Sequence, residues 1–208
     1  MKPAIVILPL IFLLISCGTF ENSKEHTLQD VLAKIDEENT LLVRLDKCPA
    51  DYYQSTRKIS HEYFENADRC LKSPDRCLKK CLAKSADHCQ DLGLALQQQK
   101  NIAEHYADQL FAASCAMGNP SGCTNRTSRM SLATPDRKEN AQCIMRSYNT
   151  SCQADDPWGC TMYGAEIHRQ GTGQQKEMDA AFNKACDLDV DFEACTHAKT
   201  LRSFISSQ

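Results

Sequence analysis

Apolar residues recur along this chain with the spacing of amphipathic helices. Near the N-terminus, Val31, Leu32 and Ile35 fall on one side of a helix that Thr27 can cap and that runs to about Leu45. Few segments alternate apolar and polar residues with period two. The pattern therefore predicts an all-α fold.

Proline residues mark the starts of several further helices. Pro120, Pro135 and Pro157 each follow a residue whose side chain can cap a helix. The predicted helices cover about 27–45, 50–67, 74–84, 86–98, 101–116, 120–131, 135–153, 157–169, 175–188 and 191–205. The leading segment, 27–46, is expected to cover the open end of a helical array, a role that we favour over partner binding.

Cysteines bound a unit that repeats along the chain. Twenty-five residues separate Cys89 from Cys115, and the same number separate Cys160 from Cys186. Corresponding cysteines at positions 81, 115, 152 and 186 are 34, 37 and 34 residues apart. This is the period of stacked helix-turn-helix units, so we predict an α/α solenoid over residues 48–205.

The repeats share a packing pattern when they are aligned on their cysteines. Residues at offsets of three, four and seven lie on one helical face and are expected to form the core: Leu92, Leu96, Phe111, Arg126, Met130, Tyr148, Tyr163, Ile167 and Phe182. Gly93 and Gly164 should let the paired helices approach closely. Arg126 and Thr127 interrupt the pattern, so the middle repeat should be the irregular one.

The N-terminus has the features of an export signal. Residues 1–16 hold one basic residue and an apolar run too short to span a bilayer, and they precede Cys17 in a context that resembles the bacterial lipobox. We predict a lipoprotein signal peptide at 1–16, lipid on Cys17 and a tether at 17–26. Gly18, by resemblance to Gram-negative lipoproteins, favours the outer membrane.

The chain has 13 cysteines, and 12 remain when Cys17 is set aside. An even number in an exported chain predicts a disulfide framework. Bridges across the helix corners would pair Cys81 with Cys89, Cys115 with Cys123, Cys152 with Cys160 and Cys186 with Cys195. Among the others, Cys48 with Cys77 and Cys70 with Cys77 are both compatible with the sequence, and Cys143 is either a free thiol or an intermolecular one.

Charge and cysteine spacing exclude other classes of protein. The net charge of −3 argues against nucleic-acid binding. A basic run at 69–84 is interpreted as a solvated helix face. Some cysteines and a histidine have the chemistry of zinc ligands but not the usual spacing, so no metal or cofactor is predicted; they are Cys70, Cys77, Cys81, His88 and Cys89.

Residues 159–186 resemble the Sel-like repeat, a relative of the tetratricopeptide repeat, and its disulfide-rich branch in the Helicobacter cysteine-rich proteins. The resemblance depends on Gly159, Cys160, Gly164, Gly171, Gly173, Ala180, Ala181 and Cys186. It implies a right-handed superhelix whose concave side binds protein or peptide partners. The family includes members reported to bind penicillin or to hydrolyse β-lactams weakly, and periplasmic immunity lipoproteins.

Two functions follow as expectations. The first is a non-enzymatic binding module of the bacterial envelope, including an immunity- or inhibitor-type adaptor. Its concave face would carry Leu94, Gln98, Leu132, Met162 and Arg169, beside Asp91, Asn125, Ser128 and Ala165, although these side chains could equally pack against adjacent repeats. The second is a serine hydrolase of β-lactams that uses the Ser-x-x-Lys pair Ser55 and Lys58.

Overall fold

The computed structural model describes residues 19–37, 41, 45–54, 63–99, 102, 104–133, 137–171, 173–188 and 193–207, with helical backbone alone at 19–27, 63–66 and 137–139. Within these ranges the chain is all-helical and has no strand, as predicted. The helices are α1 (Thr19–Glu37), α2 (Pro49–Tyr52), α3 (Tyr63–Lys72), α4 (Pro74–Leu82), α5 (Ala86–Gln97), α6 (Glu104–Ala116), α7 (Pro120–Ala133), α8 (Arg137–Gln153), α9 (Pro157–Gln170), α10 (Gln175–Leu188) and α11 (Glu193–Ile205). None of these described helices is both long and apolar enough to cross a bilayer.

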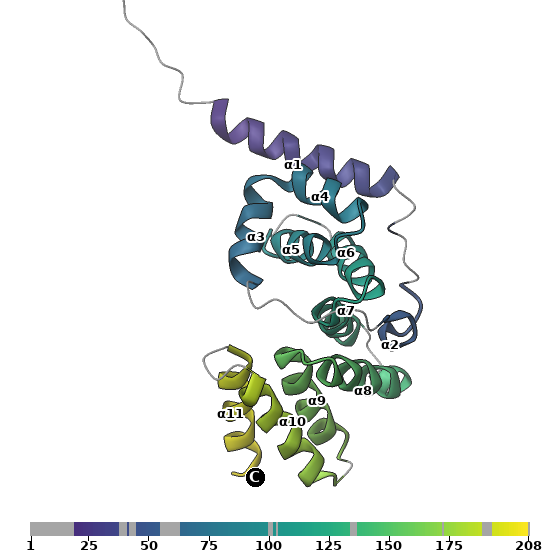
Figure 1. Cartoon of the computed structure of the whole chain (residues 1–208), viewed down its shortest axis with the longest axis vertical. Helices are drawn as coiled ribbons and strands as arrows, with labels where there is room; N and C mark the ends of the chain where they lie inside the picture. The colour runs from purple at the N-terminus through teal and green to yellow at the C-terminus, as the bar shows by residue number, and fades with distance from the viewer. Residues whose placement is uncertain are drawn as a thin grey trace, which may run out of the picture.

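From α5 onward the helices stack in chain order, each packed against the next (Figure 1). We call α5, α7, α9 and α11 the first helices, and α6, α8 and α10 the second helices. The predicted starts at 86, 120, 157 and 175 coincide with the observed ones. The helix α1 lies across one end of the stack, where it packs on α4.

The helix corners repeat one backbone geometry. At three corners the third residue after the first cysteine has a left-handed conformation: Lys84 (φ 70°), Gly118 (φ 89°) and Asp155 (φ 64°). The amide of the following residue then donates to the carbonyl five residues back, at 3.1 Å each time. This hydrogen bond closes the end of a helix. Corners with different residue types are therefore built alike.

A disulfide closes each corner. The four corner bridges are all present, with Cα separations between 4.3 and 4.7 Å: Cys81–Cys89, Cys115–Cys123, Cys152–Cys160 and Cys186–Cys195. By the chain-entropy estimate, each loop of this length contributes about 2.5 kcal/mol to the free energy of unfolding. Together the four bridges contribute an amount comparable with the net stability of a whole domain.

The apolar core consists of two clusters separated at α7. The first cluster joins α1 and α3–α6 and includes Val31 and Leu92, and the second joins α8–α11 and includes Tyr148 and Phe182. Between them, α7 buries mainly small or polar residues: Pro120, Ser121, Gly122, Cys123, Thr124, Arg126, Thr127 and Ser131. The predicted irregularity of the middle repeat therefore corresponds to a break in the core.

Two glycines let an aromatic ring lie directly against a first helix. A Cβ atom at Gly93 would lie 2.6 Å from the ring of Phe111, and one at Gly164 would lie 2.6 Å from the ring of Phe182. The close approach expected from the sequence is therefore observed in both repeats. The middle repeat has Thr127 at this position, where its hydroxyl donates to the carbonyl of Cys123 at 2.7 Å.

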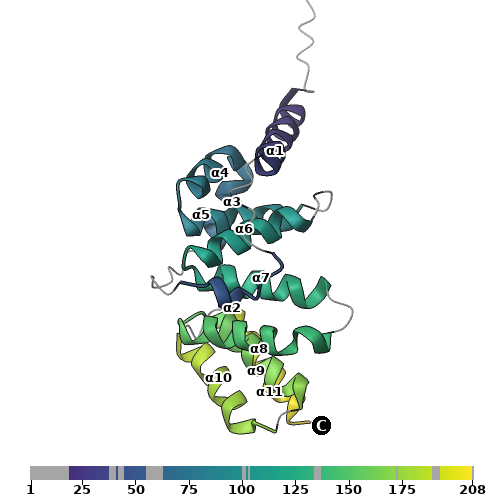
Figure 2. The same ribbon diagram turned by 90° about the vertical axis from the view of Figure 1, so that its right-hand side faces the viewer.

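The N-terminal third differs from the expectation. The helix α1 begins at Thr19, within the expected tether, and ends at Glu37, earlier than predicted. The single helix expected at 50–67 is wrong, because α2 ends at Tyr52 and the next residue, Tyr53, is extended. Rather than starting a helical pair, α2 packs on α6, α7 and α8 (Figure 2).

We expect Gly164→Ala to lower the free energy of unfolding by about 1–3 kcal/mol, because the added methyl group would overlap the ring of Phe182. Urea unfolding followed by circular dichroism measures the change. In the double variant Gly164→Ala/Phe182→Leu the two losses should be less than additive. Strict additivity would show that the ring and the glycine do not constrain each other.

Candidate functional site

The five predicted binding residues differ in exposure. Leu132 is 70 % exposed on α7, and Gln98 and Arg169 are also exposed. Leu94 is half-buried, and Met162 is a half-buried residue packed on the second core cluster. Leu132 is therefore the apolar side chain of this set that is most available to a partner.

Asp91, which was expected beside that face, is buried. Its side chain is 6 % exposed on α5, the helix on which α3 packs. Burial raises the pKa of Asp91 to about 7; the nearby Asp87 adds to the rise and Arg69 opposes it. Gln90 is 1 % exposed, and within the described part of the chain neither the nitrogen nor the oxygen of its side-chain amide has a hydrogen-bond partner. Polar groups are therefore enclosed on this side of α5.

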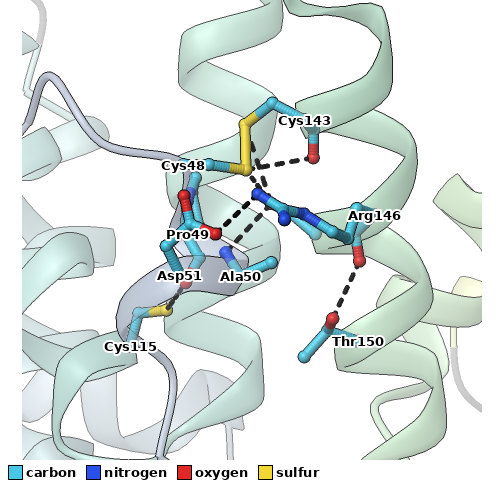
Figure 3. A network of polar contacts seen from close by, with 9 residues as sticks. Cys48, Pro49, Ala50, Asp51, Cys115, Cys143, Arg146 and Thr150 are labelled. Carbon is cyan, nitrogen blue, oxygen red and sulfur yellow. Dashed lines mark hydrogen bonds and ion pairs between the residues drawn. A yellow bond between two sulfur atoms is a disulfide. The ribbon is translucent and has the colours of Figure 1, made fainter.

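A short segment crosses the second-helix side of the stack at the break in the core. We call residues 45–53 the strap; it contains α2, which contacts α6, α7 and α8. A disulfide joins Cys48 to Cys143 of α8 across 95 residues of sequence (Figure 3). The second bridge not settled by the sequence is Cys70–Cys77. Cys143 is thus neither free nor intermolecular, and Cys48 does not pair with Cys77.

Polar contacts hold the strap beside this bridge. The amide of Ala50 donates to the hydroxyl of Ser147 at 3.2 Å, and Arg146 forms an ion pair with Asp51 at 2.6 Å (Figure 3). The carbonyl oxygen of Pro49 lies 3.6 Å from the sulfur of Cys115. Because both members of the ion pair are about half exposed, it contributes little to stability. The disulfide is the strongest single link between the strap and the stack.

Arg126 connects the strap to the interior of α7. It occupies a core position, is 7 % exposed, and donates to the carbonyl oxygen of Leu45 at 2.9 Å. Its other terminal nitrogen lies 4.0 Å from Asp108 of α6. Burial raises the pKa of Tyr52 to about 12, with Arg126 opposing the rise and Asp108 adding to it. The other repeats have Leu92 or Tyr163 at this position. Here the guanidinium of Arg126 makes polar contacts instead.

A pocket of about 320 Å³ lies next to this cluster, one helical turn from Leu132. It is lined by Leu96, Gln97, Gln99, Ile102, Glu104, Ala107 and Arg129. Arg129 donates to Asp108 at 3.1 Å and forms an ion pair with Glu104. The hydrogen bond from Arg129 lowers the pKa of Glu104. The lining of the pocket therefore includes both apolar side chains and the ion pair between Arg129 and Glu104.

Asp156 joins consecutive first helices. It caps α9 by accepting from the amide of Gly159 at 3.1 Å, and it accepts from Ser121 at 2.9 Å and Thr124 at 2.5 Å, both on α7. Burial raises the pKa of Asp156, while the donors from Thr124 and Ser121 oppose the rise. At the corresponding position Asn119 caps α7 and donates to Asp87 of α5 at 3.3 Å. These contacts fix the spacing of the first helices.

Several predicted residues lie outside the described part of the chain, namely Cys17, Ser55 and Lys58. The cysteines weighed as zinc ligands all form disulfides, so their thiolates are not available to a metal. The described residues contain no cluster of three or more His, Cys, Asp or Glu side chains that could hold one. The cations of the basic run at 69–84 are exposed at the ends of α3 and α4.

No protein-family model matches the chain, and neither a curated protein nor a solved structure matches it significantly.

Sequence reasoning missed the strap junction. Two signals pointed toward it: the polar residues Arg126 and Thr127 at core positions, and the two cysteines Cys48 and Cys143 outside the corner pattern. Neither signal relates position 48 to position 143, because the contact spans 95 residues. The packing of α2 on three later helices is what brings the two cysteines together.

We expect Cys48→Ser/Cys143→Ser to lower the free energy of unfolding by about 4–5 kcal/mol, as the chain-entropy estimate gives for a loop of nearly 100 residues. The matched control, Cys70→Ser/Cys77→Ser, opens a loop with a sequence separation of 7 and should cost about 2.5 kcal/mol. Urea unfolding measures both. An equal or smaller loss for the strap pair would contradict this account.

The raised pKa of Asp91 predicts a pH-dependent stability. The folded chain holds this proton more tightly than the unfolded chain, in which aspartate titrates near 3.8. The resulting stabilisation is complete below about pH 3.8 and is lost as the pH rises to about 7.

Relative to wild type, we therefore expect Asp91→Asn to become progressively more stable as the pH rises from 5 to about 7, with no further gain above that. Urea midpoints measured across this range test the expectation. The exposed Asp187→Asn serves as the control. If the stabilities of wild type and Asp91→Asn run parallel over the range, Asp91 does not carry the effect.

Proposed function

We propose that this chain is a lipid-anchored protein of the bacterial outer membrane that faces the periplasm and acts as a non-enzymatic binding module. In this proposal the helices form a right-handed solenoid of Sel-like repeats, and a protein or peptide partner binds to the concave face formed by the first helices. The observation that carries the proposal is the exposure of Leu132 on a disulfide-stapled scaffold.

The spacing of the helices supports a curved stack. The helix α7 contacts α5 on one side and α9 on the other, and α9 contacts α11. The second helices make at most sparse contacts with one another, and the strap lies between α6 and α8. First helices that contact one another and second helices that are spread apart favour a stack whose concave side is the first-helix side.

The chemistry of this face suits a polypeptide partner. Leu132 offers an exposed apolar contact, while the exposed Gln98 and Arg169 offer polar contacts nearer the two ends of the stack. The pocket next to Arg129, one turn from Leu132, can receive a side chain. Disulfides at successive corners keep the helices in place, which reduces the entropy lost on binding.

The anchor is supported by sequence alone, through the apolar run that ends at Cys17 and the resemblance to the lipobox. Mass spectrometry of the N-terminal peptide tests it. A mass consistent with a diacylglyceryl-modified Cys17 supports the proposal, and an unmodified Met1 contradicts it.

We expect Leu132→Asp to weaken binding of an envelope partner at least about tenfold, as for a central apolar contact. The partner is captured by crosslinking in envelope extract and its affinity is then measured with purified components. Phe204→Asp, which changes a 59 % exposed residue on α11, is the matched control and should bind normally. Because both residues are exposed, neither variant should unfold; equal binding by the two variants would refute the proposed face.

A further inference from the structure

Among the disulfides of the described residues, the strap bridge is the one whose two cysteines are both partly exposed. Cys48 and Cys143 are both half-buried, whereas every other bridge has at least one fully buried cysteine. The strap bridge spans 95 residues of sequence, and the others span 7 to 9. A thiolate must reach a sulfur atom to exchange with it, so exposure makes reduction selective. The strap bridge is therefore the one that a reductant would open first.

The polar contacts between the stack and the strap mostly involve the main chain of the strap. Arg126 donates to the carbonyl of Leu45, Ser147 accepts from the amide of Ala50, and the Pro49 carbonyl meets the sulfur of Cys115. Besides the disulfide, the ion pair between Asp51 and Arg146 depends on a side chain of the strap. A surface that binds carbonyl and amide groups can also bind another short segment with the same one-turn backbone as α2.

The closed strap leaves polar atoms unsatisfied. The hydroxyl of Tyr52 and the Nε of Arg126 are buried and have no hydrogen-bond partner among the residues that the structure describes. Leaving such groups without a partner is costly, because they lose their hydrogen bonds to water. The Cys48–Cys143 bond thus holds the strap in a position that leaves buried polar atoms without hydrogen bonds. Breaking this bond therefore favours release of the strap from the stack.

We propose that the surface of α6, α7 and α8 beneath the strap is a second binding site for a short peptide of a partner protein that forms one helical turn, as α2 does, and that the strap masks this site while Cys48 and Cys143 are joined. The partner would present a carbonyl to Arg126 and an amide to Ser147, with a carboxylate placed to meet Arg146. This site lies on the second-helix side and does not depend on the proposed partner of the first-helix face.

The opening step is a thiol–disulfide exchange with a dithiol reductant. One thiolate of the reductant attacks a sulfur of the Cys48–Cys143 bridge, and the other cysteine leaves as a thiolate. The second thiol of the reductant then attacks the mixed disulfide. Two protein thiols and one oxidised dithiol result, so two electrons and two protons pass to the protein.

Limited reduction of the full chain with dithiothreitol tests the opening. Alkylation and mass spectrometry should find Cys48 and Cys143 modified before the corner cysteines, and amide exchange across 49–53 should accelerate at least about tenfold. Corner bridges that reduce first, or strap amides that stay equally protected after selective reduction, would overturn the proposal.

The site itself is tested with C48S, which leaves the thiol of Cys143 as a reporter. The probe is a synthetic peptide of residues 45–54 whose cysteine carries an activated disulfide; the control is a scrambled peptide of the same composition. We expect the strap peptide to couple to Cys143 about tenfold faster or more, because docking raises its effective concentration. The selectively reduced wild type provides the same comparison if C48S folds poorly.

Two further arms separate docking from intrinsic reactivity. In urea the two peptides should couple to the unfolded chain at equal rates, and in C48S/R146A the preference for the strap peptide should shrink. Equal rates on the folded chain would refute the second site. Leu132→Asp should leave the preference unchanged, so failure of the first-helix face and failure of this site are distinguishable.

Discussion

The middle of the molecule depends on a covalent bond at the place where its apolar core is interrupted. On one side of α7 the core is built around Leu92 and Leu110, and on the other around Tyr148 and Phe182. The helix between them buries hydroxyls and a guanidinium, which provide little hydrophobic stabilisation. The Cys48–Cys143 bridge joins the N-terminal segment to the second half at this point.

The rest of the stack repeats a simpler solution. A disulfide closes each corner, and at three of the corners a left-handed residue shapes the turn. Glycine permits close approach where a ring or a neighbouring backbone requires it. Polar caps such as Asp156 and Asn119 then connect one first helix to the next. Stability thus comes from many local constraints, so the chain can form an extended array without one large core.

This division of labour has a functional consequence. Local bridges, each with at least one buried cysteine, hold the helix corners in place, which would suit the proposed binding face. The strap bridge is partly exposed and links residues far apart in the sequence. The strap itself covers part of α6, α7 and α8 on the second-helix side of the stack. Disulfides therefore have two roles: at the corners they are permanent cross-links, and in our proposal the strap disulfide is a reversible one.

The sequence by itself determined the helical class, most helix starts, the four corner bridges and the glycine contacts, because each depends on residues close in sequence or on a strict period. It also located the irregular repeat through Arg126 and Thr127. The tertiary structure alone decided the path of residues 45–53, the pairing of Cys48 with Cys143, the burial of Asp91 and the exposure of Leu132. These features depend on which helices, far apart in the sequence, pack together. Such long-range contacts produce no repeating pattern of residues from which they could be predicted.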